Sequence, residues 1–387
     1  MSKTGFVLKC WQARFLLFSI VLSLMAPVIV NEKPLLIFDR DGGVHFPVFK
    51  SATVDTSGFG DGFSLHALIP YSPGKSDYAN AGFKGPFDQH FELDENGKLT
   101  PLPWYKHHWF GTDLRGSDIL AYTVYGLRNS IGISLIAILI SLVIASLIGF
   151  IGGWYVRDPL RVGVLEFLVI VFWMFLIFHG VLNIYSQGDK WLYLAIVTLI
   201  CYCALQLTRR FAMKPLMNIR FDVFSDRLGE LFIAVPRMIF LMVFVQYADR
   251  SILSLAVVIG ITGWVDLARL IRAETIRLRE QSFIEAATVA GIGMKRMFLR
   301  HVLPNIWPSV MVVSMYSFSS NIMIESSLSF FGLGLPPDQP SIGTILSEAR
   351  SYYEYWWMFL LPGIWLSVII YALFTLPGRL NKLKSTS

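Results

Sequence analysis

Long apolar runs separated by polar segments make up most of the chain, and their lengths are the first structural indication that the sequence offers. A helix that crosses a bilayer needs about 20 consecutive, mostly apolar residues. Runs close to that length predict about eight transmembrane helices, near residues 13–30, 129–157, 163–185, 191–208, 229–247, 251–270, 305–325 and 356–377. The pattern therefore predicts an all-α polytopic membrane protein.

The longest polar stretch, residues 31–128, lies between the first and second of these runs. It is rich in Gly, Asp, Pro and aromatic residues, and pieces such as HFPVF and FSLHALIP are typical of short strands. It contains 9 basic and 12 acidic residues, so it is acidic overall. We expect a small, partly β lobe outside the membrane.

Basic residues gather in the segments that would lie on the opposite side from this lobe. Lys and Arg concentrate in the cytoplasmic loops of membrane proteins. The segments that this rule assigns to the cytoplasm are 1–14, 156–162, 209–228, 271–304 and 378–387. Both termini are therefore predicted to be cytoplasmic, and the lobe is predicted to be on the outer side.

The composition agrees with a membrane protein, since 54% of the residues are hydrophobic and 16% are charged, against about a quarter charged in soluble domains. The net charge of +6 could suit a nucleic acid, but basic cytoplasmic loops account for it, and no nucleic-acid partner is expected. Cys10, Cys201 and Cys203 fit neither a disulfide framework nor a metal site. The first apolar run could be a cleaved signal peptide or a retained anchor, and its poor cleavage pattern favours the anchor.

Residues 285–304, EAATVAGIGMKRMFLRHVLP, interrupt the apolar pattern inside a predicted cytoplasmic loop. Glu285 would lie in the first turn of a helix, where the helix dipole favours a negative charge. Gly291 would end that helix in the left-handed conformation. The helical spacing i, i+3, i+4, i+7 predicts one apolar face, formed by Phe283, Ala286, Ala287 and Ala290.

A second short helix is expected after Gly291, and Pro304 is expected to end it before the next span begins. Met294, Met297, Phe298 and Val302 would form one side of it, and Lys295, Arg296 and Arg300 another. Such a pair of helices could rest on lipid headgroups as an amphipathic connector. Its Met and Phe side chains could equally form an adaptable surface for another protein. The residues alone leave both interpretations open.

The same residues carry a resemblance to a known family. Glu285-Ala286-Ala287, then Gly291, and then Leu303-Pro304 resemble the EAA loop of binding-protein-dependent ABC importer permeases. Three further segments resemble the dipeptide and oligopeptide C-type permease subunits in the right order: FGTDLRGSDILAYTVYGLRNSIGISL (110–135), GITGWVDLARLIRAETIRLREQSFIEAATVAGI (260–292) and ESSLSFFGLGLPPDQPSIGTIL (325–346).

This resemblance implies a transport subunit of the bacterial cytoplasmic (inner) membrane that forms half of a translocation pathway. Its implied partners are a second permease subunit, two ATP-binding subunits and a solute-binding protein at the outer face, together with membrane lipid. ATP would be bound by the partner subunits, so this chain would hold no cofactor and would not itself be an enzyme. Residues 285–304 would dock on an ATP-binding subunit, and the cytoplasmic loop that contains them, 271–304, is here called the coupling segment. The implied cargo is a dipeptide or oligopeptide, and nickel or another small solute is the alternative.

The chain departs from the family, whose permease core has six helices. The domains predicted are an N-terminal tail and first helix (1–30), a periplasmic lobe (31–128), a second helix (129–157), an insertion with two extra helices (158–228) and a core that contains the coupling segment (229–387). The insertion would serve as lipid-facing padding or, less expectedly, as a partner-binding surface.

Three polar residues are candidates for a role in or near the membrane. Arg237, within the run 229–247, would line the pathway or pair with a carboxylate, because an isolated charge there is costly. Glu325 would bond to the backbone at a helix break or contact a substrate amine, and Asp266 would pair with Arg269.

No catalytic or metal-ligand pattern is present. The five histidines of the lobe match no ligand spacing, and PGKS lacks the first glycine of a phosphate-binding loop. HExxH, GxSxG and GxGxxG do not occur. A membrane-anchored enzyme and a gradient-driven secondary transporter remain as rival classes, but neither accounts for the motifs of residues 285–304.

Overall fold

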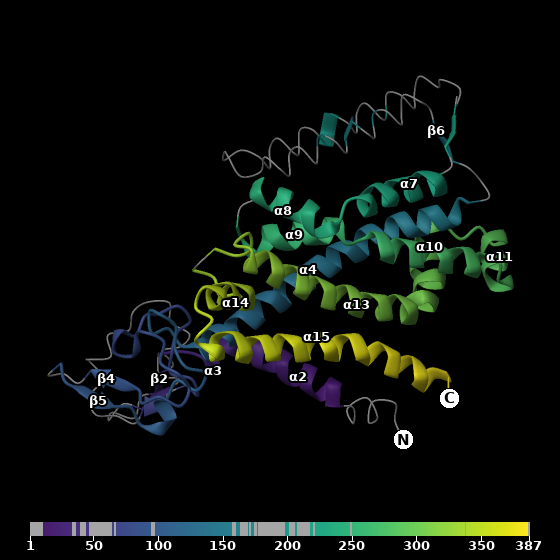
Figure 1. Cartoon of the computed structure of the whole chain (residues 1–387). Helices are drawn as coiled ribbons and strands as arrows, with labels where there is room; N and C mark the ends of the chain where they lie inside the picture. Colours follow the sequence, from purple (N-terminus) through teal and green to yellow (C-terminus); the bar gives the residue numbers. More distant parts are fainter. Residues whose placement is uncertain are drawn as a thin grey trace. The chain divides into compact units, whose positions relative to one another are not determined.

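The protein is described from a computed structural model, and it is mostly helical (Figure 1). The structure describes residues 11–32, 67–93, 97–156, 221–247, 250–336 and 338–385, with short pieces at 36–38, 44–45, 64–65, 160–162 and 217–219 and a few residues between 169 and 206. The spans predicted at 163–185 and 191–208 lie largely outside these residues.

Contacts divide the chain into two compact units. The first contains Met1–Leu135, Arg250–Leu253 and Met315–Ser387, and the second contains Ile136–Asp249 and Ser254–Ser314.

The helices of the first unit are α2 (Trp11–Leu24), α3 (Ala26–Ile29), the first half of α4 (Ile119–Trp154), the second half of α13 (Leu303–Phe330), α14 (Ile342–Ser351) and α15 (Trp356–Ser385). Helix α2 runs beside α15 (Figure 1), where Leu16 packs with Ile369 and Leu373. The rings of Trp11 and Tyr371 stack at 6.1 Å.

The described part of the polar stretch 31–118 contains five short strands, so some of the expected β content is present. Strands β1 (Leu36–Phe38), β2 (Val44–His45) and β3 (Ser64–Leu65) form one antiparallel sheet in the order β2-β1-β3. Strands β4 (Phe91–Leu93) and β5 (Leu99–Pro101) form a second. A single turn of 3-10 helix, η3 (Tyr78–Asn80), precedes this second sheet, and another, η4 (Trp104–Lys106), follows it.

The second unit contains the rest of α4 and most of the coupling segment. Its helices are α7 (Phe221–Ala234), α8 (Arg237–Tyr247), α9 (Ile252–Thr262), α10 (Val265–Arg279), α11 (Ser282–Val289), α12 (Met294–Arg296), the π-helical turn η5 (Met297–Val302) and the first half of α13. Strands β6 (Leu160–Val162) and β7 (Met217–Ile219) pair antiparallel, with Leu160 opposite Ile219. The two ends of the predicted insertion therefore lie side by side.

Within the described residues, two helices are long and apolar enough to cross a membrane: α4 and, in α15, Trp356–Arg379. The number rises to four if each of two bent helix pairs is one span. Helix α2 is apolar but shorter, and α13 is not in this set. The structure thus agrees with a membrane protein of several spans, while the expected number of eight stays a prediction.

Two of the predicted spans are broken rather than straight. The run 229–247 is α7 followed by α8, bent by 84°, and α7 begins at Phe221, earlier than expected. The break coincides with Pro236, because the residue before a proline is pushed out of the helical conformation. The run 251–270 is α9 followed by α10, bent by 45° next to Gly263.

Glycines on α4 let other helices of the second unit come close. A Cβ on Gly149 would lie 2.6 Å from the carbonyl oxygen of Ala268 on α10, and one on Gly153 would lie 2.7 Å from Cβ of Thr275. On α9, a Cβ on Gly260 would lie 2.8 Å from a carbonyl oxygen of α4. Small residues at such crossings allow the tight backbone contact by which membrane helices associate.

Candidate functional site

The coupling segment begins in α10 and turns sharply after α11. Gly291 has φ of +72°, its N–H donates to the Thr288 carbonyl at 3.0 Å, and the N–H of Ile292 donates to the Ala287 carbonyl at 3.2 Å. This pair of bonds is the Schellman motif, which needs a left-handed residue at its centre. The predicted helix end at Gly291 is confirmed.

Helix α11 has one buried side and one exposed side. Ile284 and Ala287 are buried, whereas Ala286 and Ala290 are exposed, Phe283 is 43% exposed and Val289 is 85% exposed. Of the predicted apolar face, Phe283, Ala286 and Ala290 are therefore exposed, and only Ala287 is buried. The buried line runs through Ile284 instead, which turns the rest of the predicted face toward solvent.

Glu285 lies in the first turn of α11, as expected, and its side chain is exposed. Together with the apolar side chains of the exposed side, it forms a surface that the described residues of this chain do not cover. We call this surface the α11 face: Phe283, Glu285, Ala286, Val289 and Ala290.

The second helix of the segment does not end at Pro304. Helix α12 passes through η5 into α13, and Pro304 is the second residue of α13. A proline is tolerated in the first turn of a helix, where its missing N–H has no intrahelical acceptor to serve. Leu303 is partly buried and Pro304 is exposed. The wide π turn joins α12 to α13 without an interruption, where the sequence predicted the end of a helix.

Side chains of this second helix divide as expected. Met297 and Val302 are buried, and the basic residues Lys295, Arg296 and Arg300 are exposed. Phe298 contacts Phe150 of α4, with ring centroids 4.7 Å apart.

The coupling segment is fixed to α4 through α10. A guanidinium nitrogen of Arg279, at the end of α10, donates to the carbonyl of Trp154, and its charge lies 5.4 Å from the indole ring. Glu274 of α10 accepts a hydrogen bond of 3.0 Å from Ser309 of α13. Movement of α11 would therefore be passed to α4 and α13 through α10.

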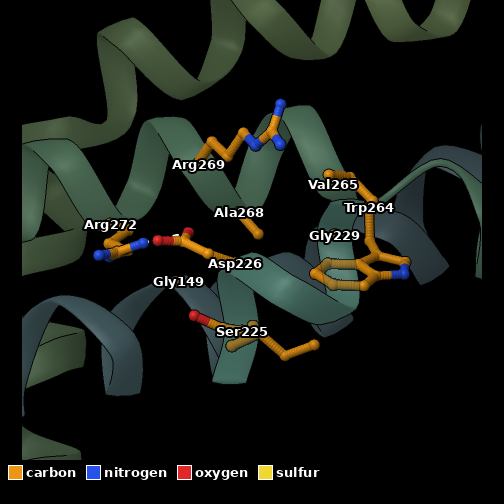
Figure 2. A pocket seen from close by; sticks show the side chains of 10 residues that line it. Gly149, Ser225, Asp226, Gly229, Trp264, Val265, Ala268, Arg269 and Arg272 are labelled. Carbon is orange, nitrogen blue, oxygen red and sulfur yellow. Dashed lines mark hydrogen bonds and ion pairs between the residues drawn. The ribbon is translucent and has the colours of Figure 1, made fainter. Parts of the chain in front are cut away.

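Helix α10 also contacts α7 (Figure 2). Asp226 of α7 and Arg272 of α10 form an ion pair beside a cavity of about 10 Å³, which is room for about one water molecule. The cavity is too small for a cargo molecule. Arg269 points away from this pair in Figure 2, and Asp266, in the first turn of α10, is exposed. The described residues show no Asp266–Arg269 ion pair.

Arg237 is not eight residues into a continuous span, because it is the first residue of α8 after the break at Pro236. Its guanidinium donates to the Ile259 carbonyl at 2.9 Å and to the Thr262 hydroxyl at 3.3 Å. Both partners lie at the carboxyl end of α9, where a positive charge suits the helix dipole. A Cβ on Gly263 would lie 2.7 Å from this guanidinium, so the glycine leaves room for it.

Glu325 is fully buried and is surrounded by serines. Its carboxyl group accepts hydrogen bonds from Ser130 of α4, from Ser329 at 2.9 Å and from Ser341 at 2.8 Å. Ser341 also caps the first turn of α14. The carboxyl group thus joins α4, α13 and α14, and nothing in the sequence indicated the two distant serines.

Histidines of the lobe meet close to the start of α4. His108 is buried and bonds to Asp118 at 2.8 Å, and Asp77 lies 3.5 Å away. Burial alone would lower the pKa of His108, but the bonds to Asp118 and Asp77 outweigh it, so the pKa is raised. Burial and the neighbouring His108 and His107 lower the pKa of His90 to about 4. The described residues contain no group of three or more His, Cys, Asp or Glu placed to hold a metal ion.

Fold and site together describe a mostly helical protein with several apolar helices and an exposed helix, α11. Comparison with known proteins extends this description. Residues 211–382, a little under half of the chain, match the family described as "Binding-protein-dependent transport system inner membrane component". This match bears out the resemblance of the motifs to ABC importer permeases.

Relatives extend the similarity beyond that segment. The chain is 25% identical over 372 residues to the inner membrane ABC transporter permease protein YejE of Escherichia coli, covering 93% of this chain and 89% of that one. It is 29% identical over 268 residues to a Brucella suis protein named as a peptide permease, covering 68% of each. The oligopeptide transport system permease protein OppC of Salmonella typhimurium is 34% identical over 154 residues, which is 40% of this chain and 51% of OppC.

Proposed function

We propose that this chain is one of two permease subunits of an ATP-driven importer of dipeptides or oligopeptides, and that the α11 face docks on an ATP-binding subunit. The names of the relatives support the cargo, since both the Brucella and the Salmonella proteins are named for peptides. The observation that carries the docking role is the α11 face, whose apolar side chains are exposed on the helix that follows α10, and α10 is bonded to α4.

The proposed mechanism follows from these contacts. Closure of the ATP-binding subunits would displace α11, and α10 would pass the displacement to α4 through the Gly149 and Gly153 contacts. ATP then shifts the population between inward-open and outward-open pathways, because it binds one arrangement of the partner subunits more tightly. The partner subunits hold and hydrolyse the ATP, and this chain supplies the moving pathway.

The proposed topology has cytoplasmic termini, a periplasmic lobe and eight spans in a bacterial inner membrane, six of them in the core and two in the insertion. The distribution of basic residues supports it. A second permease subunit would complete the pathway, and a periplasmic or surface solute-binding protein would deliver the cargo to the lobe side. Glu325 is proposed to hold helices together, because its carboxyl group is bonded to serine hydroxyls of different helices. Arg237 is proposed to stabilise the break between α9 and α10, because its guanidinium is bonded to the carboxyl end of α9.

Cross-linking from single cysteines tests the docking role. Ala287 is buried in the structure, so the reagent belongs at Ala286 or Ala290, which are exposed. In the assembled complex we expect cross-links from Ala286→Cys and Ala290→Cys to an ATP-binding subunit that change in yield with ATP. Tyr78→Cys on the lobe is the control and should give none. Cross-links from Ala286→Cys to lipid alone, during active import, would refute the docking role.

A further inference from the structure

The lobe carries an exposed aromatic surface that the transport mechanism does not use. Two hollows of about 140 and 390 Å³ share His107 and Trp109 as lining residues, so they are neighbours. Large apolar side chains at their edges are exposed, with Leu68 at 77% and Trp104 at 76%. We call this surface the aromatic patch: Leu68, Trp104, Tyr105 and Trp109.

The aromatic patch lies where membrane helices begin. Leu120, in the first turn of the membrane-spanning α4, lines the same hollow as Leu68. Ile69, the neighbour of Leu68, pairs with Val30 at the end of α3. The patch therefore adjoins the first turn of α4 and the end of the first helical segment.

The residues of α15 also lie against the lobe, next to the aromatic patch. Phe110, which follows Trp109, packs against Trp365 at 6.3 Å, and a Cβ on Gly111 would touch Trp357. The residues that precede and begin α15, YYEYWW, include exposed Tyr353 and Trp356. Trp and Tyr are enriched where membrane proteins cross the headgroup layer, because their rings are apolar and their N–H or O–H groups still reach water.

Charge distribution distinguishes the patch from the cleft beside it. The charged side chains Glu32, Lys75, Asp77, Glu92 and Lys106 line a cleft of about 530 Å³, which meets the smaller aromatic hollow at Pro70. Among the described residues that line the two aromatic hollows, the acidic or basic ones are His107 and Asp118. Asp118 is buried and bonded to His108, so contact with lipid would desolvate no free carboxylate.

We propose that the aromatic patch lies in the lipid headgroup layer and holds the lobe against the membrane surface. A bilayer is favoured over a protein partner because the patch adjoins the first turn of α4 and because, among the described residues, its hollows are lined by no acidic or basic side chain other than His107 and Asp118. The proposal requires only that α4 and α15 span the membrane, so it does not depend on the cargo or on coupling to ATP.

The test uses full-length chain in nanodiscs, with Cys10, Cys201 and Cys203 changed to serine. An environment-sensitive fluorophore is attached to Leu68→Cys or Trp104→Cys, and Tyr78→Cys in the charged cleft is the matched control, since Tyr78 is 83% exposed. Spin-labelled lipids carry the quencher at the headgroup or in mid-chain, and iodide is the aqueous quencher.

We expect headgroup-labelled lipid to quench the Leu68 and Trp104 labels severalfold more than the Tyr78 label, with iodide showing the reverse order. Equal iodide quenching at all three positions would overturn the proposal. Protection from iodide that develops only after the second permease subunit or the purified solute-binding protein is added would also overturn it, and would assign the patch to that protein.

Discussion

Gly291 allows the coupling role to be tested by backbone strain alone. No atom lies within 4 Å of the position that a Cβ would occupy there, and φ is +72°. A substitution would therefore meet no steric clash with other residues, and its cost would come from the left-handed conformation. That cost is about 1–2 kcal/mol for an ordinary residue, and a β-branched side chain such as valine lies at the upper end.

A free-energy change of that size alters the ratio of closed to open turns by a factor of about 5–30. The bonds from the Gly291 and Ile292 amides, which close the turn, are expected to open first. With Gly291→Val, the end of α11 would be loosened, and displacement of the ATP-binding subunit would be absorbed in the turn instead of reaching α10. ATP hydrolysis would continue, and peptide imported per ATP would fall.

Gly293→Val is the matched control. Gly293 is also exposed with no atom within 4 Å of a Cβ, but its φ of −64° and ψ of 149° suit a β-branched residue. Peptide uptake and phosphate release would be measured in proteoliposomes containing the assembled complex, and hydrogen exchange would be followed at the two turn amides. Faster exchange in Gly291→Val with unchanged uptake per ATP would refute the coupling role, and unchanged exchange would refute the strain argument.

Three further predictions concern the interior and the lobe. Glu325→Ala should lower the free energy of unfolding by about 2–4 kcal/mol, because buried serine hydroxyls lose their acceptor. Thermal unfolding in detergent checks this prediction. A higher KM for amine-bearing cargo at unchanged stability would instead indicate that Glu325 contacts the substrate. Gly149→Ala should destabilise the protein by about 1–3 kcal/mol through overpacking against α10. Gly132→Ala on the same helix should not, because Gly132 has open space around it. The Gly149→Ala variant should therefore show the lower midpoint of thermal unfolding. The raised pKa of His108 means that its contacts with Asp118 and Asp77 stabilise the lobe below about pH 6.5 and that this contribution is lost as pH rises through the folded-state pKa. Asp118→Asn should weaken that dependence in unfolding measured from pH 6.5 to 9, and an unchanged profile would contradict the pairing.

Short-range sequence signals predicted one helix end, at Gly291, but not the two breaks within apolar runs. The helix end at Gly291 could be predicted because a Schellman turn depends on one residue and its immediate neighbours. The breaks at Pro236 and Gly263 were equally visible, but unbroken hydropathy through both positions favoured straight spans. The spacing predicted an apolar face on α11 but did not say which side of the helix is buried, because alanines mark a helix face only weakly; packing of Ile284 decides it.

Contacts between distant residues could not be predicted. Ser130 and Glu325 are 195 positions apart, and Asp226 and Arg272 are 46 apart. No spacing rule joins such residues, since their meeting depends on how several helices pack. Its charge near the end of an apolar run identified Glu325 as a residue of interest, but its partners required the structure.

The serine-lined carboxyl group of Glu325 also bears on how the protein is made. A carboxyl group is costly to bury unless it is hydrogen-bonded, and Glu325 is fully buried near the end of α13. The hydroxyls that bind this carboxyl group come partly from α4, which the ribosome completes long before α13, and partly from Ser341, which emerges afterwards. The burial of Glu325 is therefore complete only after α14 has been synthesised and has packed, together with α4, against α13.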